Sequence, residues 1–372
     1  MILAKKIRIK PTKKQEHQLW KSVGTARWAY NWTLGKQEEN YKNGGKFISD
    51  EFLRKELTVL KQTEEYSWLY DVSNNITKQA IKDACDAYKK FFNNQANKPR
   101  FKSRKKSKPS FYNDPIKLKV KKNKVLIEKV GLIKTFELLP MGVKYFNPRI
   151  SFDGKYWYLS VGMEEGVQST ELTDVSLGID VGVKELAVCS DGRKFKNMNK
   201  TKAVKKAVKR LRRLQRQVSR KYEMNKEGDR FVKTSNIIKI ERKVRNLYRR
   251  LSNIRTNYLH QTTNDIVKTK PYRIVMETLN IKGMMKNKHL SEAIAKQGLY
   301  EFKRQIQYKC EKHGIEFVEA DKWYPSSKMC SCCGTVKKNL KLSDRVYQCD
   351  CGLIVDRDLN ASINLSHYQL AN

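Results

Sequence analysis

Two cysteine pairs near the C-terminus constrain the fold more than any other part of the sequence. Cys330 and Cys333 form a C-x2-C-G motif, Cys349 and Cys351 form a C-x-C-G motif, and fifteen residues separate the pairs. This is close to zinc-ribbon spacing, and the glycine after each pair permits the positive φ that such a turn needs. Four thiolates close a tetrahedral shell, so the predicted zinc is structural. The alternative to a zinc site is that these four thiols are ordinary core residues. Cys332 belongs to neither pair, so the predicted site does not need it.

An acidic motif, DRDLNASINL, follows the second cysteine pair. Its alternating small and apolar residues predict a packed helix with Asp358 at the start. Two roles remain open for this carboxylate, because an acid at a helix start can cap backbone N–H groups or can bind a metal. Asp356 is a rival for the second role.

The charge balance predicts a polyanionic partner. The 372 residues contain 78 Lys and Arg against 38 Asp and Glu, a formal net charge of +40. A globular chain with this charge repels itself unless a polyanion binds, so nucleic acid is the leading partner. An acidic membrane surface is the competing partner, but the sequence has neither a long apolar span nor a signal peptide. We therefore expect a cytoplasmic, nucleoid-associated protein with no membrane partner; the oligomeric state is left open.

The first part of the chain, 1–170, is predicted to form a small β-barrel or sheet. Residues 2–10 alternate as a strand, 116–164 read as further strands, and a helical region over about 12–110 is inserted between them. A basic run with interleaved aromatics, 98–112, offers phosphate contacts and stacking surfaces, although it can also be a solvated loop. Its candidate nucleic-acid contacts are Lys98, Arg100, Lys102, Arg104 and Lys105.

An α/β core is predicted over 171–320. A strand ends near Asp180, and the apolar run YRIVM predicts a buried strand with Glu277 at its C-terminal end. In open α/β sheets, catalytic and ligand-binding residues lie at the C-terminal ends of the strands. Residues 200–258 predict two long helices with an apolar seam and basic outer faces, which bind a nucleic-acid backbone or are merely solvated. Their candidate contacts are Lys209, Arg212 and Arg213.

The rest of the core completes the predicted domain order. A basic loop over 282–290 is a candidate lid, and one helix is expected from Ser291 to His313. The ribbon is assigned to 321–353, and 354–372 supply the last motif of the core and a tail. Asp180, Glu277 and Asp358 then give three hard oxygen ligands, which suit Mg²⁺. Two such ions about 4 Å apart can drive phosphodiester hydrolysis. This arrangement resembles the RuvC-type RNase H fold.

The motifs GIDVGVKELAV, IVMETLNIKG and CSCCG through CDCGLIVDRDLNASINL resemble the three split RuvC motifs and the zinc ribbon of TnpB proteins, which are encoded by insertion sequences and related to type V CRISPR effectors and Fanzor proteins. The opening KIRIKPTKKQEHQLWKSVGTARWAYNWTL and the run KPRFKSRKKSKPSFY are also similar to that family. The resemblance implies an N-terminal wedge β-barrel with an inserted helical recognition region, followed by a RuvC-like nuclease with an inserted ribbon.

The same resemblance implies an activity and its residues. It implies an endonuclease that binds a guide RNA, checks a short target-adjacent motif and cuts matching double-stranded DNA. Asp180, Glu277 and Asp358 would be the catalytic acids with two Mg²⁺ ions, and the four paired cysteines would bind Zn²⁺. The D-x-N-A spacing of related nucleases favours Asp358 over Asp356. A transposase, a guided repressor that does not cut and a guide-free nuclease are the alternatives.

Overall fold

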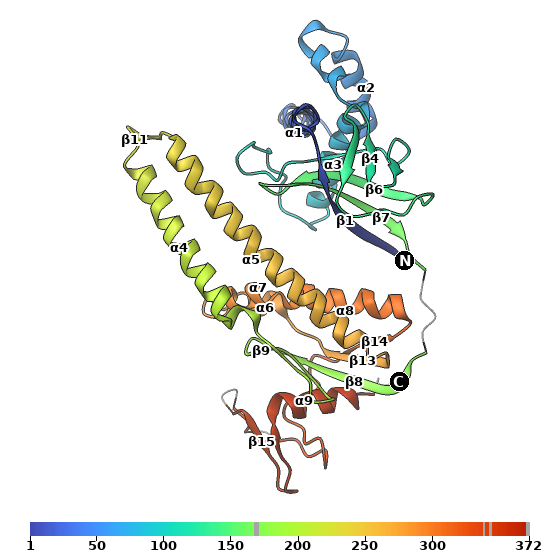
Figure 1. The fold of residues 1–372 in the computed structure, drawn as a ribbon, viewed down its shortest axis with the longest axis vertical. Helices are drawn as coiled ribbons and strands as arrows, with labels where there is room; N and C mark the ends of the chain where they lie inside the picture. Colours follow the sequence, from blue (N-terminus) through green and yellow to red (C-terminus); the bar gives the residue numbers. More distant parts are fainter. Residues whose placement is uncertain (167–170, 338, 342–343, 370–372) are drawn as a thin grey trace. The chain divides into compact units, whose positions relative to one another are not determined.

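The computed structural model describes residues 1–166, 171–337, 339–341 and 344–369. They form two compact units, Ile2–Glu165 and Gly166–Asn372, the second together with Met1. The polar boundary segment predicted around residue 170 includes 167–170, which lie outside the described residues. Each unit has its own sheet (Figure 1).

The N-terminal unit is built on a seven-stranded antiparallel sheet with the order β2-β6-β7-β1-β5-β4-β3. Its strands are β1 (Ile2–Lys10), β2 (Ser110–Tyr112), β3 (Lys119–Lys121), β4 (Lys124–Ile127), β5 (Gly131–Thr135), β6 (Tyr145–Phe152) and β7 (Trp157–Glu164). Of the two forms predicted, a barrel or a sheet, the ladders of the described residues give an open sheet with β2 and β3 at its edges. Alternating side chains such as Ile7, Ile9 and Leu159 point into the core.

Four helical segments lie between β1 and β2 in the chain, as the sequence predicted. They are α1 (Lys13–Lys42), α2 (Asp50–Leu60), the 3₁₀ helix η1 (Glu64–Asp71) and α3 (Asn74–Phe92). Helix α1 starts at a capping box: the Gln15 N–H donates to Thr12 Oγ1 at 3.3 Å, and the Thr12 N–H donates to Gln15 Oε1 at 3.0 Å. Because Leu19, Val23 and Ala26 follow helical spacing, one face of α1 packs against the sheet core.

The C-terminal unit has a five-stranded sheet with the order β10-β9-β8-β13-β14. Its strands are β8 (Thr173–Val181), β9 (Glu185–Cys189), β10 (Lys194–Lys196), β13 (Pro271–Glu277) and β14 (Glu316–Ala320). Strands β8, β13 and β14 are parallel, whereas β9 and β10 pair antiparallel. The strands predicted at Asp180 and Glu277 are thus neighbours in one sheet.

Helices cover both faces of this sheet (Figure 1). Helices α5 (Ser235–Val267) and α8 (Leu299–His313) pack on the face that presents Ile179 and Met276. Helix α9 (Arg357–Ser366) packs on the other face, where Val275 contacts its buried Leu365. A Cβ at Gly178 would overlap Ser362 O and Ser366 N, so only glycine allows α9 to approach β8 this closely.

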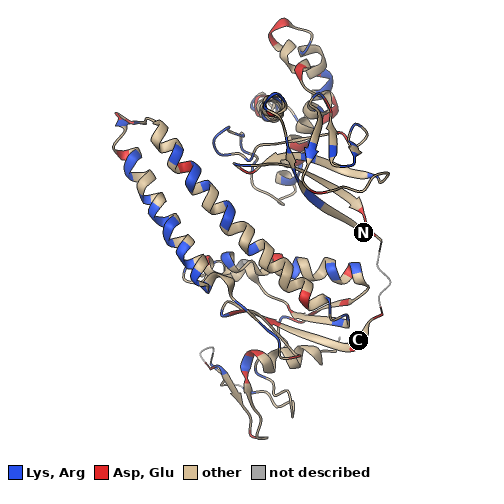
Figure 2. Ribbon diagram, in the orientation of Figure 1, with Lys and Arg blue, Asp and Glu red and all other residues tan. Residues whose placement is uncertain are grey.

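The predicted helical pair consists of α4 (Lys202–Glu223) and α5, joined at the tip by β11 (Lys226–Glu227) and β12 (Arg230–Phe231). Its seam is apolar, with Leu211, Leu214, Leu247 and Leu251 buried, while Val218 lies outside that cluster. Lysine and arginine cover the outer faces of both helices (Figure 2).

Two predictions for the segment that follows β13 need correction. The candidate lid begins with a short helix, α6 (Ile281–Met284), instead of an irregular loop. The single helix predicted over 291–313 is two helices, α7 (Ser291–Gln297) and α8, separated by Gly298. Gly298 has φ 74°, a left-handed conformation that ends one helix and that glycine adopts without the cost of a Cβ.

The ribbon sequence folds beside α9, with β15 (Val346–Gln348) paired antiparallel to β16 (Ile354–Asp356). Gly334 and Gly352 have φ of 75° and 90°, which confirms the positive φ predicted after each cysteine pair. Among the helices of the described residues, none is both long and apolar enough to cross a bilayer.

Candidate active site, metal site and nucleic-acid interfaces

Strand alternation brings two of the predicted acids to the same place. Asp180 is two residues beyond Gly178, so it lies on the face of β8 that α9 covers, and Glu277 is two residues beyond Val275 on the same face of β13. Ile179 pairs with Met276 in the parallel ladder, so Asp180 and Glu277 are one step beyond that pair, at the C-terminal ends of adjacent strands. Asp358 is in the first turn of α9, the helix over this face.

The structure assigns the capping role to Asp356. Its Oδ1 accepts the backbone N–H groups of Asp358 and Leu359 at 3.0 and 3.2 Å, and its Oδ2 accepts the Lys194 ammonium at 3.0 Å. Burial opposes ionisation, but the bonds to Lys194 and to these N–H groups lower the pKa of Asp356 overall. The N-cap interpretation of Asp358 is therefore wrong, because Asp356 fills that position.

Electrostatics link the three acids that the sequence singled out. Burial, and then the charges of Asp358 and Glu277, raise the pKa of Asp180 well above its usual range. Burial also raises the pKa of Glu277. The Arg357 guanidinium opposes both shifts and offsets only part of them. Burial is the first cause of both raised pKa values, and neighbouring carboxylates add to it only for Asp180, so ionisation of these two acids is unfavourable without an added positive charge.

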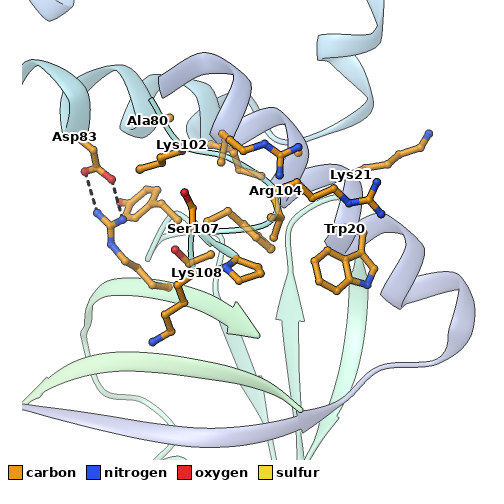
Figure 3. A pocket seen from close by; sticks show the side chains of 18 of the residues that line it. Trp20, Lys21, Ala80, Asp83, Lys102, Arg104, Ser107 and Lys108 are labelled. Carbon is orange, nitrogen blue, oxygen red and sulfur yellow. Dashed lines mark hydrogen bonds and ion pairs between the residues drawn. The ribbon is translucent and has the colours of Figure 1, made fainter. Parts of the chain in front are cut away.

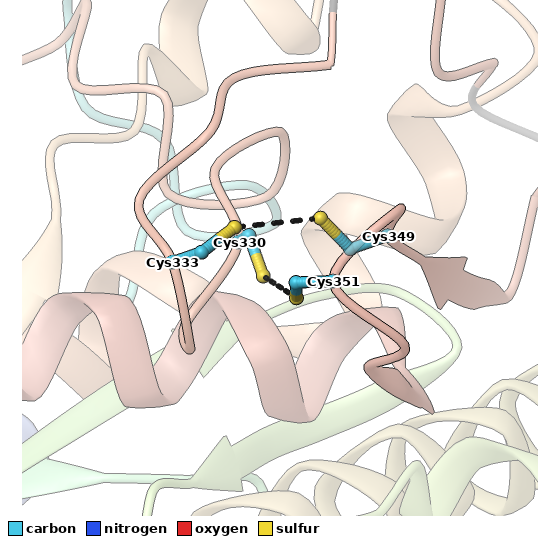
Figure 4. A group of neighbouring side chains, drawn as sticks. All are labelled: Cys330, Cys333, Cys349 and Cys351. Carbon is cyan, nitrogen blue, oxygen red and sulfur yellow. Dashed lines mark hydrogen bonds between the residues drawn. The ribbon is translucent and has the colours of Figure 1, made fainter.

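The four paired cysteines converge, as Figure 4 shows. Their Sγ atoms all lie within 4.8 Å of one another. Cys330 Sγ is 3.6 Å from Cys351 Sγ, and Cys333 Sγ is 3.5 Å from Cys349 Sγ. Sulfur atoms at the corners of a tetrahedral zinc site with Zn–S bonds of about 2.3 Å are about 3.8 Å apart, so the cluster has the size and the donor set for zinc.

The first cysteine turn is fixed to α9 by two buried asparagines. Asn360 Nδ2 and Asn364 Nδ2 both donate to the Met329 carbonyl at 2.7 Å. The Ser331 N–H donates to Asn360 Oδ1 at 3.0 Å. These bonds flank Cys330, so the ribbon and the helix that carries Asp358 share one hydrogen-bond network.

The basic run contributes to a cavity of about 340 Å³ in the N-terminal unit (Figure 3). Lys102 and Arg104 line it, together with Trp20 and Lys21 of α1. The Asn31 amide holds the run in place by bonding both the N–H and the carbonyl of Lys102 at 2.8 Å. Cations and an aromatic ring around one cavity suit nucleic acid.

The remaining predicted contacts are dispersed. Lys98 pairs with Glu38 at 3.2 Å, and Arg100 and Lys105 are exposed outside that cavity. In the helical pair, Lys209 and Arg212 line one groove and Arg213 is exposed beside it.

Sequence reasoning missed several site residues. The cavity also uses Arg149, whose guanidinium binds the Asp83 carboxylate through two bonds of 2.8 and 3.0 Å. No local pattern marks this pair, because 66 residues separate its members. Arg357 was detectable, since it lies between the two rival acids. The Asn360 and Asn364 pair was also detectable from its i, i+4 spacing on a helix.

Comparison with known structures defines the class. A Cas12f1–sgRNA–target DNA complex matches with a TM-score of 0.60 at 14% identity, covering 98% of both chains. The mini-RNA-guided endonuclease CRISPR-Cas_phi3 matches with a TM-score of 0.51 at 10% identity, covering 99% of this chain and 92% of the other. The protein therefore has the fold of the compact CRISPR effector nucleases.

Sequence relatives define the family. The chain is 31% identical to a "Putative RNA-guided DNA endonuclease" of Streptomyces pristinaespiralis over 97% of this chain and 87% of the relative. It is 30% identical to "Putative RNA-guided DNA endonuclease InsQ" of Escherichia coli K12, over 96% and 89%. Family models match as "Helix-turn-helix domain" (1–46), "Probable transposase" (159–288) and "Cas12f1-like, TNB domain" (300–365). The chain belongs to the TnpB family of insertion-sequence proteins.

Proposed function

We propose that this protein is a transposon-encoded, RNA-guided DNA endonuclease. It would bind a guide RNA, recognise a short target-adjacent motif and hydrolyse matching double-stranded DNA. The observation that carries the proposal is the placement of Asp180 and Glu277 at the ends of adjacent parallel strands, under the helix that bears Asp358. The names of the relatives and the fold of the guided effectors support the same activity.

The three carboxylates offer the hard oxygen donors that Mg²⁺ prefers, and the charges of Asp358 and Glu277 act on Asp180. Bound there, two Mg²⁺ ions would supply an activated water and charge stabilisation on the leaving oxygen. Asp180, Glu277 and Asp358 would hold and orient the ions. Arg357 would partly offset the raised pKa values of Asp180 and Glu277, and the four cysteines would hold a structural zinc that maintains the ribbon beside α9.

Nucleic acid would bind through charge and stacking surfaces in each unit. In such a system guide pairing supplies sequence specificity, so the protein needs to grip the backbone and read only a short motif. The cavity lined by Lys21, Lys102 and Arg104 is one such surface. The activity would place the protein on the nucleoid, in the cytoplasm.

A transposase is the second candidate, because one family model and a relative from Paramecium bursaria Chlorella virus 1, "Putative transposase A625R", carry that description. Strand transfer requires paired element ends, whereas guided cleavage requires a bound RNA. RNA dependence therefore separates the two.

The test is to express the protein with its native flanking DNA, sequence the RNA that copurifies and assay cleavage of DNA matching that RNA in Mg²⁺. We expect a discrete RNA and cleavage that Asp180→Ala abolishes while DNA binding persists. Asp174→Ala, an exposed acid on the same strand, is the matched control and should cut normally. Cleavage by Asp180→Ala, or random cellular RNA in the purified protein, would refute the proposal.

A further inference from the structure

Arg357 lies between the helix cap Asp356 and the third predicted acid, Asp358, at the first position of α9. A helix carries positive partial charge at its N-terminus, so cations are favoured near the opposite end. The charge of Arg357 therefore opposes the helix dipole, and the stability of α9 does not account for an arginine at this position. The contacts of its side chain indicate another role.

Two carbonyls of the ribbon hold one end of the guanidinium. Arg357 Nη1 donates to the Lys341 carbonyl at 3.0 Å and to the Asp344 carbonyl at 3.4 Å. The backbone N–H of Arg357 also donates to the Arg345 carbonyl at 2.9 Å. A carbonyl accepts hydrogen bonds but carries no net charge, so these contacts fix the side chain without neutralising it.

The other edge of the guanidinium has no acceptor in the protein. Within the described residues, Arg357 Nε and Nη2 donate to no carbonyl or side chain, and the guanidinium forms no ion pair. The N–H groups of Nε and Nη2 lie on the same edge of a planar group. They form a fork that matches two oxygens of a phosphate.

The charge of this guanidinium reaches the carboxylate centre. It opposes the rise in the pKa of Asp180 and of Glu277, which burial causes first. Arg357 is thus close enough to act on both acids, yet it is paired with neither. Its unbonded edge and its charge are available beside a centre that we propose hydrolyses phosphodiesters.

We propose that Arg357 is a catalytic residue that donates hydrogen bonds from Nε and Nη2 to the non-bridging oxygens of the scissile phosphate. The proposal rests on the proposed nuclease function and adds a residue to it.

The role of Arg357 in the reaction is electrostatic. In the hydrolysis, a water oxygen bonds to phosphorus as the bond from phosphorus to the leaving sugar oxygen breaks. The water loses one proton to solvent and the leaving oxygen gains one, which gives a phosphate monoester and an alcohol. Arg357 transfers no proton, because a guanidinium stays protonated; it stabilises the negative charge that builds up on the phosphate oxygens.

The test uses the full chain purified with its own RNA. Single-turnover cleavage of guide-matched DNA is measured at saturating DNA and Mg²⁺, and DNA affinity is measured separately without a divalent cation. We expect Arg357→Ala to slow cleavage by roughly 10²-fold or more, the effect of removing one preorganised donor to a transition-state oxyanion, with unchanged DNA affinity. Millimolar guanidinium chloride should restore part of the rate, because the free cation can replace the lost side chain. It should not restore cleavage to Asp180→Ala.

Arg304→Ala is the matched control, since Arg304 is an arginine of the same unit that is paired with Glu301 on α8. This variant should cut at the normal rate and gain nothing from guanidinium. Arg357→Lys keeps the charge but not the fork, so its rate should lie between those of the unmutated protein and Arg357→Ala.

A purely structural role of Arg357 in holding the ribbon gives a different pattern. Arg357→Ala would then lose zinc or exchange the amide protons of α9 faster, and guanidinium would not restore cleavage. That pattern, or normal cleavage by Arg357→Ala, would overturn the proposal alone. Absence of guided cleavage by the unmutated protein would reject the nuclease function, and the role of Arg357 with it.

Discussion

Two aspartates separated by one residue perform different tasks in this structure. Asp356 caps α9 and pairs with Lys194, whereas the charge of Asp358 contributes to the raised pKa of Asp180. An N-cap and a metal ligand need the same functional group, so the sequence left both roles open for Asp358 and made Asp356 a rival for the metal. The hydrogen bonds of Asp356 separate them, because its carboxylate already accepts two N–H groups and an ammonium, which occupy most of its lone pairs.

This separation predicts opposite outcomes for two matched substitutions. Asp358→Asn should reduce cleavage by at least roughly 10²-fold, because losing a metal ligand costs no less than losing a supporting residue. Asp356→Asn should keep cleavage within a few-fold, since asparagine also caps helices, at a stability cost of about 1 kcal/mol or less. Cleavage rates and thermal unfolding of both variants test this, and the reverse ranking of rates would make Asp356 the third acid.

A buried lysine makes the stability of the C-terminal unit depend on pH. Lys309 on α8 is 9% exposed, and its ammonium donates to the His260 carbonyl at 2.9 Å and to Thr263 Oγ1 at 2.8 Å. Burial lowers the pKa of Lys309 from 10.5 to about 8. Between these values the unfolded chain holds a proton that the folded chain releases, so the free energy of unfolding rises with pH from about 8 to 10.5.

Lys309→Met should therefore remove a pH-dependent term of about 3 kcal/mol, given about 1.4 kcal/mol per pKa unit. The variant should unfold at higher urea concentration at pH 7, and the difference from the unmutated protein should shrink as the pH rises through this window. Lys303→Met, on the same helix with its ammonium paired to Glu319, is the control and should show no such trend. If the difference in stability between Lys309→Met and the unmutated protein did not change with pH, the pH dependence could not be assigned to Lys309.

At the scale of elements, the ribbon and α9 behave as one assembly. The sequence predicted the cysteine cluster and the helix separately, as neighbours in the chain. Asn360 and Asn364 join them through the Met329 carbonyl, which lies next to Cys330. The ribbon therefore contacts the helix that carries Asp358 as well as forming the four-cysteine cluster.

Zinc removal should thus disturb the active centre. Cys330→Ser/Cys333→Ser should lose zinc, increase amide hydrogen exchange in α9 and reduce cleavage by roughly tenfold or more, the size of effect seen when support for a metal ligand is lost. Cys332→Ser changes an exposed thiol outside the cluster and should retain one zinc per chain by elemental analysis. A zinc-free variant with normal exchange in α9 and normal cleavage would show that the network is dispensable.

Other elements show which features local sequence patterns can predict and which they cannot. The strands at Asp180 and Glu277 and the long basic helices follow from residue alternation and helical spacing. The break at Gly298 did not follow from them, because a single glycine can be tolerated inside a helix. A Cβ added at Gly298 would lie only 3.2 Å from Leu259 Cδ1 of α5, so packing against α5 leaves little room for a side chain at this position.

At the scale of the whole molecule, the chain divides into two units with separate cores. Cations from distant parts of the sequence gather around a cavity in the first unit and a groove in the second. Composition predicts a polyanionic partner, and a nucleic-acid partner stays a prediction. Composition could not predict which cations line the cavity and the groove. Lys98, Arg100 and Arg213 lie outside them, although they occur in the same basic segments as Lys102 and Lys209, which line them.

The sequence by itself determined the family, the four-cysteine cluster and the strands and helices that carry the three acids, because these depend on local spacing and alternation. Only the tertiary structure decided that Asp356 caps α9, that Arg357 opposes the charge of the centre, and that Arg255 and Lys296 join α4 in one groove. These features depend on contacts between residues far apart in the chain. The sequence pattern of a single segment does not reveal such contacts.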